Sequence, residues 1–113
     1  MKAINLTTHT DLACNLVKAD NPFARIKGLL GRNSLSSGDA LLLKPCNGIH
    51  TFGMRFAIDV IFLDRKNRVV AVTKDLQPNR LTRLYLHAAS VLELPAGTID
   101  ATATVIGNEV EIA

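Results

Sequence analysis

The sequence predicts a mainly β domain of the α+β class, in which a small, compact, barrel-like sheet packs against one helix. Three observations support this prediction. Short apolar segments separated by turn-forming residues follow one another along most of the chain, as in small β domains. Helical spacing of apolar residues marks mainly one segment, about residues 22–31. The 113 residues, 48% hydrophobic and 20% charged, suit a single domain, residues 1–113, with one core.

The first elements along the chain are predicted to be a hairpin and the helix. Residues 2–6 form a strand and residues 12–17 its partner, because the polar stretch between them suits a hairpin loop. Asn21 is then placed to cap the helix, with Pro22 at its first helical position. Gly31 is placed to end it.

The chain after this helix changes to strand patterns. Residues 57–64 are the strongest strand signal, and a polar turn joins them to residues 68–73, so we predict a hairpin. Residues 81–86 also fit a helix, but a strand is favoured. The further predicted elements are strands at residues 41–43, 49–54, 91–94 and 109–112, and a short helical turn within residues 98–106.

Five segments carry a family resemblance. They are Gly28-Leu29-Leu30-Gly31-Arg32, Phe52-Gly53-Met54-Arg55-Phe56, Ile58-Asp59-Val60-Ile61-Phe62-Leu63-Asp64, Val91-Leu92-Glu93-Leu94-Pro95-Ala96-Gly97 and Gly107-Asn108. Their order and spacing resemble domain-of-unknown-function family 192, a group of small prokaryotic domains. The resemblance implies a compact β-rich domain with one packed helix, and it implies no activity. The Gly-Asp pair associated with the family is Gly107-Asn108 here, which casts doubt on any role that needs a carboxylate at that position.

Charge and hydropathy restrict the partners and the location of the protein. A net charge of +3 is a mild excess, whereas dedicated nucleic-acid binders concentrate more charge on one face, which argues against nucleic acid. No stretch approaches the roughly 20 apolar residues that span a bilayer. The start of the chain turns polar at once, so we predict no signal peptide and a cytoplasmic location. The glycines do not follow a phosphate-binding spacing, and no cofactor is predicted.

Cys46 and His50, four positions apart, are candidates for a thiol or metal site. A nearby imidazolium favours the reactive thiolate, and the pair would supply two of the four ligands of a zinc site. Cys14 with His9 or His87 would have to supply the others, and cysteines without a C-x-x-C spacing are a weak metal signal. A packed thiol and a hydrogen-bonding imidazole are therefore the favoured interpretation, and no metal site is assigned.

Asp59 is the third candidate catalytic residue. The predicted strand 57–64 is apolar on both faces, so Asp59 should be buried and should need a partner, with Arg32 and Arg55 as the expected ones. Glu93, between two leucines, raises the same question. A paired carboxylate that fixes the fold is favoured over a perturbed acid in a pocket.

The function that these patterns favour is a non-catalytic binding or accessory domain, because no complete catalytic set is evident. The predicted ligand groove lies near Arg32, Thr51, Met54 and Arg55 and serves an unknown protein or small molecule.

Two alternatives stay open at this point. The first is a thiol or metal site that uses Cys46 and His50. The second is weak polyanion or nucleic-acid binding through Lys74, Arg80 and Arg83, although a solvated basic edge is the simpler and favoured explanation of these three residues.

Overall fold

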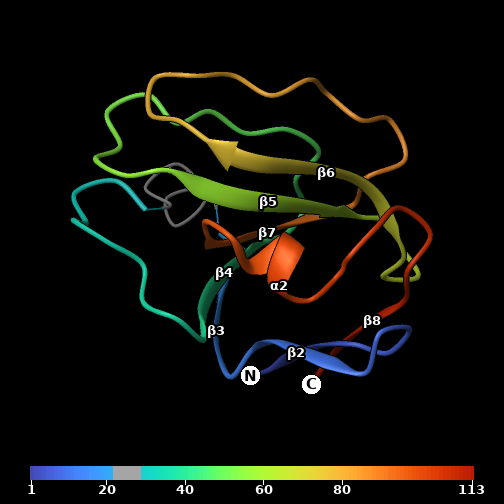
Figure 1. The fold of residues 1–113 in the computed structure, drawn as a ribbon. Coiled ribbons are helices and arrows are strands. Elements are labelled where there is room, and N and C mark those ends of the chain that lie inside the picture. Colours follow the sequence, from blue (N-terminus) through green and yellow to red (C-terminus); the bar gives the residue numbers. More distant parts are fainter. Residues whose placement is uncertain (22–28) are drawn as a thin grey trace.

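The computed structural model describes residues 1–21 and 29–113, which form two packed β-sheets (Figure 1). The small sheet has the strand order β2-β1-β8 and the large sheet the order β3-β4-β7-β5-β6. The strands are β1 (Ala3–Asn5), β2 (Thr10–Ala13), β3 (Asn15–Ala19), β4 (Asp39–Leu43), β5 (Ile58–Leu63), β6 (Val69–Leu76), β7 (Ser90–Pro95) and β8 (Val110–Ile112). The described residues thus confirm a mainly β domain, and the two sheets do not close into a barrel.

The hairpin of β5 and β6 is confirmed. Every residue of β5 is buried, and β5 pairs antiparallel with both β6 and β7. The side chain of Asp64 shapes the turn, because its Oδ1 accepts the N–H groups of Lys66 and Arg68, each at 2.9 Å. Asn67 takes a left-handed conformation there, which asparagine tolerates better than most residues.

Both faces of the large sheet are covered, which explains why its central strands are apolar without alternation. The small sheet and the short helix α2 (Thr98–Ala101) cover one face. Helix α2 confirms the helical turn predicted within residues 98–106. The loops around residues 29–35 and 49–56 cover the other. The first core contains Leu12, Val110 and Ile99 packed with Ile61, Leu63, Leu92 and Leu94, and the second contains Leu29, Leu35, Ile49 and Met54 packed with Leu41, Val60, Phe62 and Val91.

The predicted strand at residues 12–17 is divided at Cys14. Its first part, β2, pairs with β1 as expected, whereas its second part, β3, runs parallel to β4 in the large sheet (Figure 1). The change of sheet is fixed by Gly38, whose carbonyl accepts the N–H groups of Cys14 and Asn15, both at 2.9 Å. Gly38 has a φ of 88°, a left-handed conformation that favours glycine, and a Cβ atom there would also lie 2.7 Å from the Cys14 Sγ.

The strands predicted at residues 49–54 and 81–86 are wrong. Residues 46–51 and 80–89 instead run antiparallel as an irregular pair of segments, here called the loop ribbon, with a single β-bridge between His50 and Leu81. Two threonine hydroxyls replace ladder hydrogen bonds. Thr82 Oγ1 accepts the N–H of Ile49, and Thr51 Oγ1 accepts the N–H of Arg80, each at 2.9 Å.

The helix predicted at about residues 22–31 falls mostly on residues 22–28, outside the described residues. Its end, residues 29–31, forms a turn. Within the described ranges, no helix has the length and apolar character needed to cross a bilayer.

Candidate functional site

A cavity of about 1160 Å³ lies between the turn of the β5–β6 hairpin and the loop ribbon. Three stretches of chain that are distant in sequence line it: residues 44–47, the hairpin residues 64–66, 68 and 70, and residues 86–89. The N–H of Cys46 donates to the carbonyl of Ala89 at 3.1 Å and so ties the first stretch to the third. The cavity therefore forms only when the sheet and the loop ribbon are assembled.

The cavity is strongly basic. Lys44, Arg65, Lys66 and Arg68 line it, with Asp64 as the single carboxylate. The backbone N–H of Arg68, more than any other group, holds the pKa of Asp64 below its usual value, so this carboxylate is charged at neutral pH. Asp64 Oδ2 lies 3.5 Å from Arg68 Nε. The other three cations form no ion pair with any described residue, and an anion in the cavity would meet them.

The remaining lining is mostly apolar. Val70, Leu86 and Ala88 contribute aliphatic surface, and Pro45 adds to it. Such a mixture of aliphatic walls and a few charged groups is typical of small-molecule sites.

Cys46 is the one predicted catalytic candidate that lines this cavity. It is half-buried, and its Sγ donates to the carbonyl of Gly48 at 3.2 Å. His50 lies elsewhere on the loop ribbon, with its ring stacked on Phe52 at 5.3 Å between centroids. Its Nδ1 accepts the N–H of Phe52 at 3.2 Å, so this nitrogen is already used locally.

Asp59 is buried, as predicted, with 1% of its surface exposed. Its partners are three backbone N–H groups. Asp75 donates to Oδ1 at 2.9 Å, and Gly97 and Ile99 donate to Oδ2 at 3.1 and 2.8 Å. Asp59 therefore satisfies donors at the start of α2, where helical N–H groups have no partner within the helix.

The predicted pairing of Asp59 with Arg32 or Arg55 is wrong. The face of β5 that carries Asp59 turns towards α2, where the backbone supplies enough donors. Arg55 is exposed and donates to Asn33 Oδ1 at 2.7 Å, and Arg32 is exposed as well.

The three catalytic candidates do not come together. Cys46 packs against the core that contains Val60 and Phe62, on one face of the large sheet. Asp59 lies on the opposite face of the same strand and faces α2. Among the described residues, no group of three or more His, Cys, Asp or Glu side chains lies close enough to hold a metal ion.

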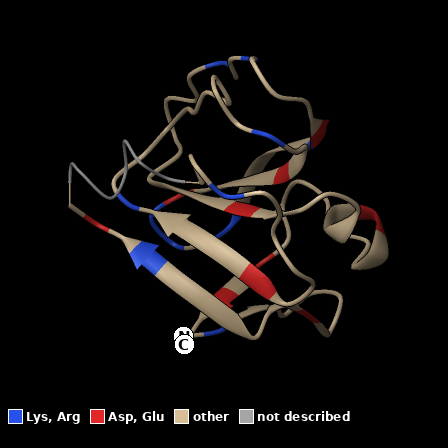
Figure 2. Cartoon of the chain, turned by 90° about the vertical axis from the view of Figure 1, so that its left-hand side faces the viewer, with Lys and Arg blue, Asp and Glu red and all other residues tan. Residues whose placement is uncertain are grey.

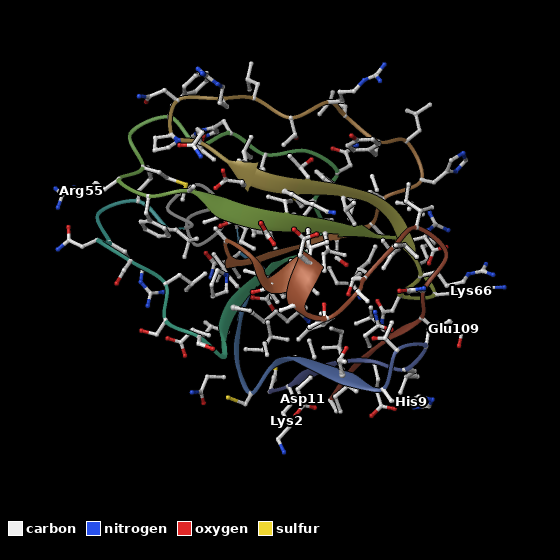
Figure 3. All side chains as sticks on the ribbon, in the orientation of Figure 1. Lys2, His9, Asp11, Arg55, Lys66 and Glu109 are labelled. Atoms are coloured by element: carbon white, nitrogen blue, oxygen red, sulfur yellow. The ribbon has the colours of Figure 1, made fainter. Side chains whose placement is uncertain are left out.

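The residues predicted to line a groove are divided between the core and the surface. Thr51 is fully buried, and its hydroxyl donates to the carbonyl of Gln77 at 2.6 Å. Met54 is buried in the second core, whereas Arg32 and Arg55 are exposed. Figure 3 shows Arg55 on the side of the molecule opposite to Lys66, which lines the cavity.

The three residues predicted to bind a polyanion, Lys74, Arg80 and Arg83, are also divided between β6 and the loop ribbon. Lys74 Nζ lies 2.7 Å from Asp100 Oδ1 on α2, and this bond raises the pKa of Lys74. The acidic character of α2 is visible in Figure 2. Arg80 and Arg83 lie on the loop ribbon, exposed, and neither belongs to an ion pair in the described part of the chain.

Glu93 lies at the centre of the large sheet, between Leu41 of β4 and Val60 of β5. Only 4% of its surface is exposed, and its Oε2 has no hydrogen-bond partner among the described residues. Burial raises the pKa of Glu93 to about 7. A carboxyl in this position favours its neutral form.

Sequence reasoning missed the cavity residues Lys44, Arg65 and Lys66. The only available signal was the polar turn at residues 65–67, which identifies a hairpin and says nothing of a site. Their convergence with Leu86 and His87 depends on how the loop ribbon packs.

Fold and site together define a small two-sheet β domain with a basic cavity beside one hairpin. The family model of DUF192, described as an uncharacterized ACR, matches residues 4–112. The chain therefore belongs to DUF192, which confirms the resemblance carried by the five sequence segments.

Known relatives agree with this assignment. The chain is 34% identical over 100 residues to a UPF0127 protein of Thermococcus sibiricus; the match covers 82% of this chain and 62% of the relative, so this chain spans less than two thirds of that protein. A protein of unknown function from Novosphingobium aromaticivorans is structurally similar, with a TM-score of 0.86 and 18% identity over 97% of this chain and 82% of that one. A putative transcription regulator from Sinorhizobium meliloti has a TM-score of 0.81 and 21% identity over 97% and 89% of the two chains. These two structures share the fold.

Proposed function

We propose that this protein is a small binding domain that holds an anionic small molecule in the basic cavity. One observation carries the proposal: Lys44, Arg65 and Lys66 line the cavity, and its single carboxylate, Asp64, is already engaged with Arg68. Unpaired cations in a concave site attract anions and raise their local concentration.

The cavity also indicates the class of ligand. Its volume of about 1160 Å³ leaves room for a small molecule, and its aliphatic wall, which includes Val70 and Leu86, suits an apolar portion beside the anionic group. A carboxylate or phosphate with an apolar body meets both requirements. This site replaces the groove expected near Arg32 and Thr51, because the Thr51 side chain is fully buried.

The test is an NMR titration of the amide signals with citrate and, separately, with inorganic phosphate at low ionic strength. Saturable shifts are expected at residues 44–47, 64–68 and 86–89. Lys66→Glu should weaken citrate binding about tenfold. Lys2→Glu, the matched control with the same charge change, lies far from Lys66 (Figure 3) and should leave binding unchanged. Equal losses in both variants, or shifts that do not saturate, would refute the site.

A second candidate function is thiol chemistry at Cys46. It is favoured by one specific observation, that Cys46 lines the same cavity as Lys44, Arg65 and Lys66. A cationic environment favours the thiolate, which is the nucleophile.

Iodoacetamide labelling followed by peptide mass analysis tests this candidate, with the exposed Cys14 as internal control. Cys46 should react ahead of Cys14 near neutral pH, and citrate should slow only Cys46. Labelling of Cys46 only after denaturation would refute thiol chemistry at this residue. Nucleic-acid binding through Lys74, Arg80 and Arg83 receives no comparable support, because Lys74 is paired with Asp100.

A further inference from the structure

The three most exposed large apolar side chains of the described residues all lie in one stretch of six residues. Leu81, Leu84 and Leu86 expose 69%, 74% and 91% of their surface. We call these three side chains the leucine ridge. Single exposed leucines need no explanation, whereas a local cluster of this kind marks an interaction surface.

The backbone beneath the leucine ridge is anchored. The N–H of Thr82 donates to the carbonyl of Ile49, and the N–H of Tyr85 donates to that of Asn47, each at 2.9 Å. The Tyr85 ring turns inward and contacts Phe62 at 4.5 Å between centroids. The leucines therefore project from a fixed support, along the segment that follows β6 over the top of the molecule in Figure 1.

Basic residues alternate with the leucines. Arg80 and Arg83 are exposed, and neither forms an ion pair with a described carboxylate. Leu86 and His87 also line the basic cavity, so the leucine ridge continues directly into the surface that carries Lys66. Exposed apolar side chains and exposed cations thus alternate along residues 80–86.

We infer that the leucine ridge docks the protein on an anionic lipid surface. Leucine side chains that project freely enter the interface of a bilayer, and the arginines beside them meet lipid phosphates. Leu81 and Leu84 lie outside the lining of the cavity and are more than two thirds exposed, so they offer a peptide no enclosed groove. A bilayer adapts to such a ridge, whereas a protein partner would itself have to supply a matching groove.

The first experiment is co-sedimentation of the full chain with vesicles of phosphatidylglycerol and phosphatidylcholine in equal parts. We expect binding that is much weaker with pure phosphatidylcholine. The triple variant Leu81→Ser, Leu84→Ser, Leu86→Ser should lose at least about tenfold in partitioning, because it removes the apolar contribution. The matched control Val17→Ser, Val105→Ser, Ile106→Ser removes three other exposed apolar side chains and should bind as the native chain does.

The second experiment uses the absence of tryptophan from the sequence. Leu86→Trp supplies a single reporter, whose emission should shift to the blue and be quenched by brominated lipid in the anionic vesicles. Val105→Trp is the control and should show neither effect.

Three outcomes would overturn the inference. They are no binding to anionic vesicles, equal binding by the triple variant and the native chain, and a Leu86→Trp emission that vesicles do not change. The last two would indicate electrostatic adsorption alone. Leu86 also lines the basic cavity, so citrate binding is measured separately on the double variant Leu81→Ser, Leu84→Ser, whose two residues do not line it. Loss of the lipid contact and failure of the cavity proposal then give different results.

Discussion

Two buried carboxyl groups on neighbouring strands, Asp59 of β5 and Glu93 of β7, invite comparison. They expose 1% and 4% of their surface, and they lie on opposite faces of the same sheet. Asp59 accepts three backbone N–H groups. Glu93 Oε2 accepts none from any described residue, and the residues that pair with Glu93 on the two adjacent strands are Leu41 and Val60.

The difference teaches that burial alone does not set the role of a carboxyl group. The Asp59 face meets a helix start, where N–H groups need an acceptor, so this side chain ties α2 and the end of β6 to the sheet. The Glu93 face belongs to the second core, where no described residue donates to Oε2 and burial raises the pKa of the carboxyl. Asp59 is therefore expected to stabilise the fold and Glu93 to cost stability.

The largest expected effect comes from Asp59→Ala. Three buried N–H groups would lose their acceptor, and the free energy of unfolding should fall by about 3 to 5 kcal/mol in urea titrations. Asp59→Asn keeps one acceptor oxygen, so its free energy of unfolding should lie between those of the native protein and Asp59→Ala. A loss in Asp59→Ala no greater than in Asp59→Asn would contradict the assigned role.

The next effect is the pH dependence caused by Glu93. Its pKa is about 7 in the folded protein and near 4.5 when unfolded, so between these values only the folded chain keeps the proton. Stability should therefore fall as pH rises from about 4.5 to about 7, by about 3 kcal/mol in total, and then level off. The difference between native and Glu93→Gln urea curves isolates this contribution. Parallel curves for the two proteins would contradict it.

A smaller gain is expected from Glu93→Leu. At pH 8 this substitution removes a buried charge from an apolar face, and stability should rise by about 1 to 2 kcal/mol. Thermal unfolding at pH 5 and pH 8 provides the check, because the gain should shrink at the lower pH. Destabilisation at both values would show that Glu93 has a stabilising contact.

The smallest effect sharpens the comparison with an exposed carboxylate. Asp100 pairs with Lys74 at 2.7 Å, but both side chains are more than half exposed. Asp100→Asn should leave the urea midpoint unchanged within error, since water solvates both partners and salt screens them. A clear shift of the midpoint would mean that this ion pair stabilises the fold despite the exposure of both side chains.

The sequence was sufficient for features that depend on local pattern. The hairpin of β5 and β6 follows from two strand-like apolar runs around a polar turn. The burial of Asp59 follows from the apolar residues on both faces of its strand. The partners of Asp59 were not predictable, because Gly97 and Ile99 contribute backbone groups, which carry no side-chain signal. Their approach depends on how β7 and α2 return to β5.

The two wrong strand predictions and the missed cavity also arise from contacts between distant segments. Residues 49–54 and 81–86 have the apolar content of strands, but the hydroxyls of Thr51 and Thr82 take over backbone hydrogen bonds and keep the loop ribbon irregular. The cavity draws its cations from separate segments, and each cation alone resembles an ordinary surface residue. Only the assembled fold gives Lys44 and Lys66 a common site.

The passage of the chain from β2 to β3 has a dynamic consequence. A single residue, Cys14, separates a strand of the small sheet from one of the large sheet, and the carbonyl of Gly38 accepts the N–H groups of Cys14 and Asn15. Separation of the strands in one sheet would therefore displace the adjoining strand of the other sheet, because only one residue links β2 to β3. Amide hydrogen exchange should accordingly find β2 and β3 in one cooperative unit, with matched protection on both sides of Cys14.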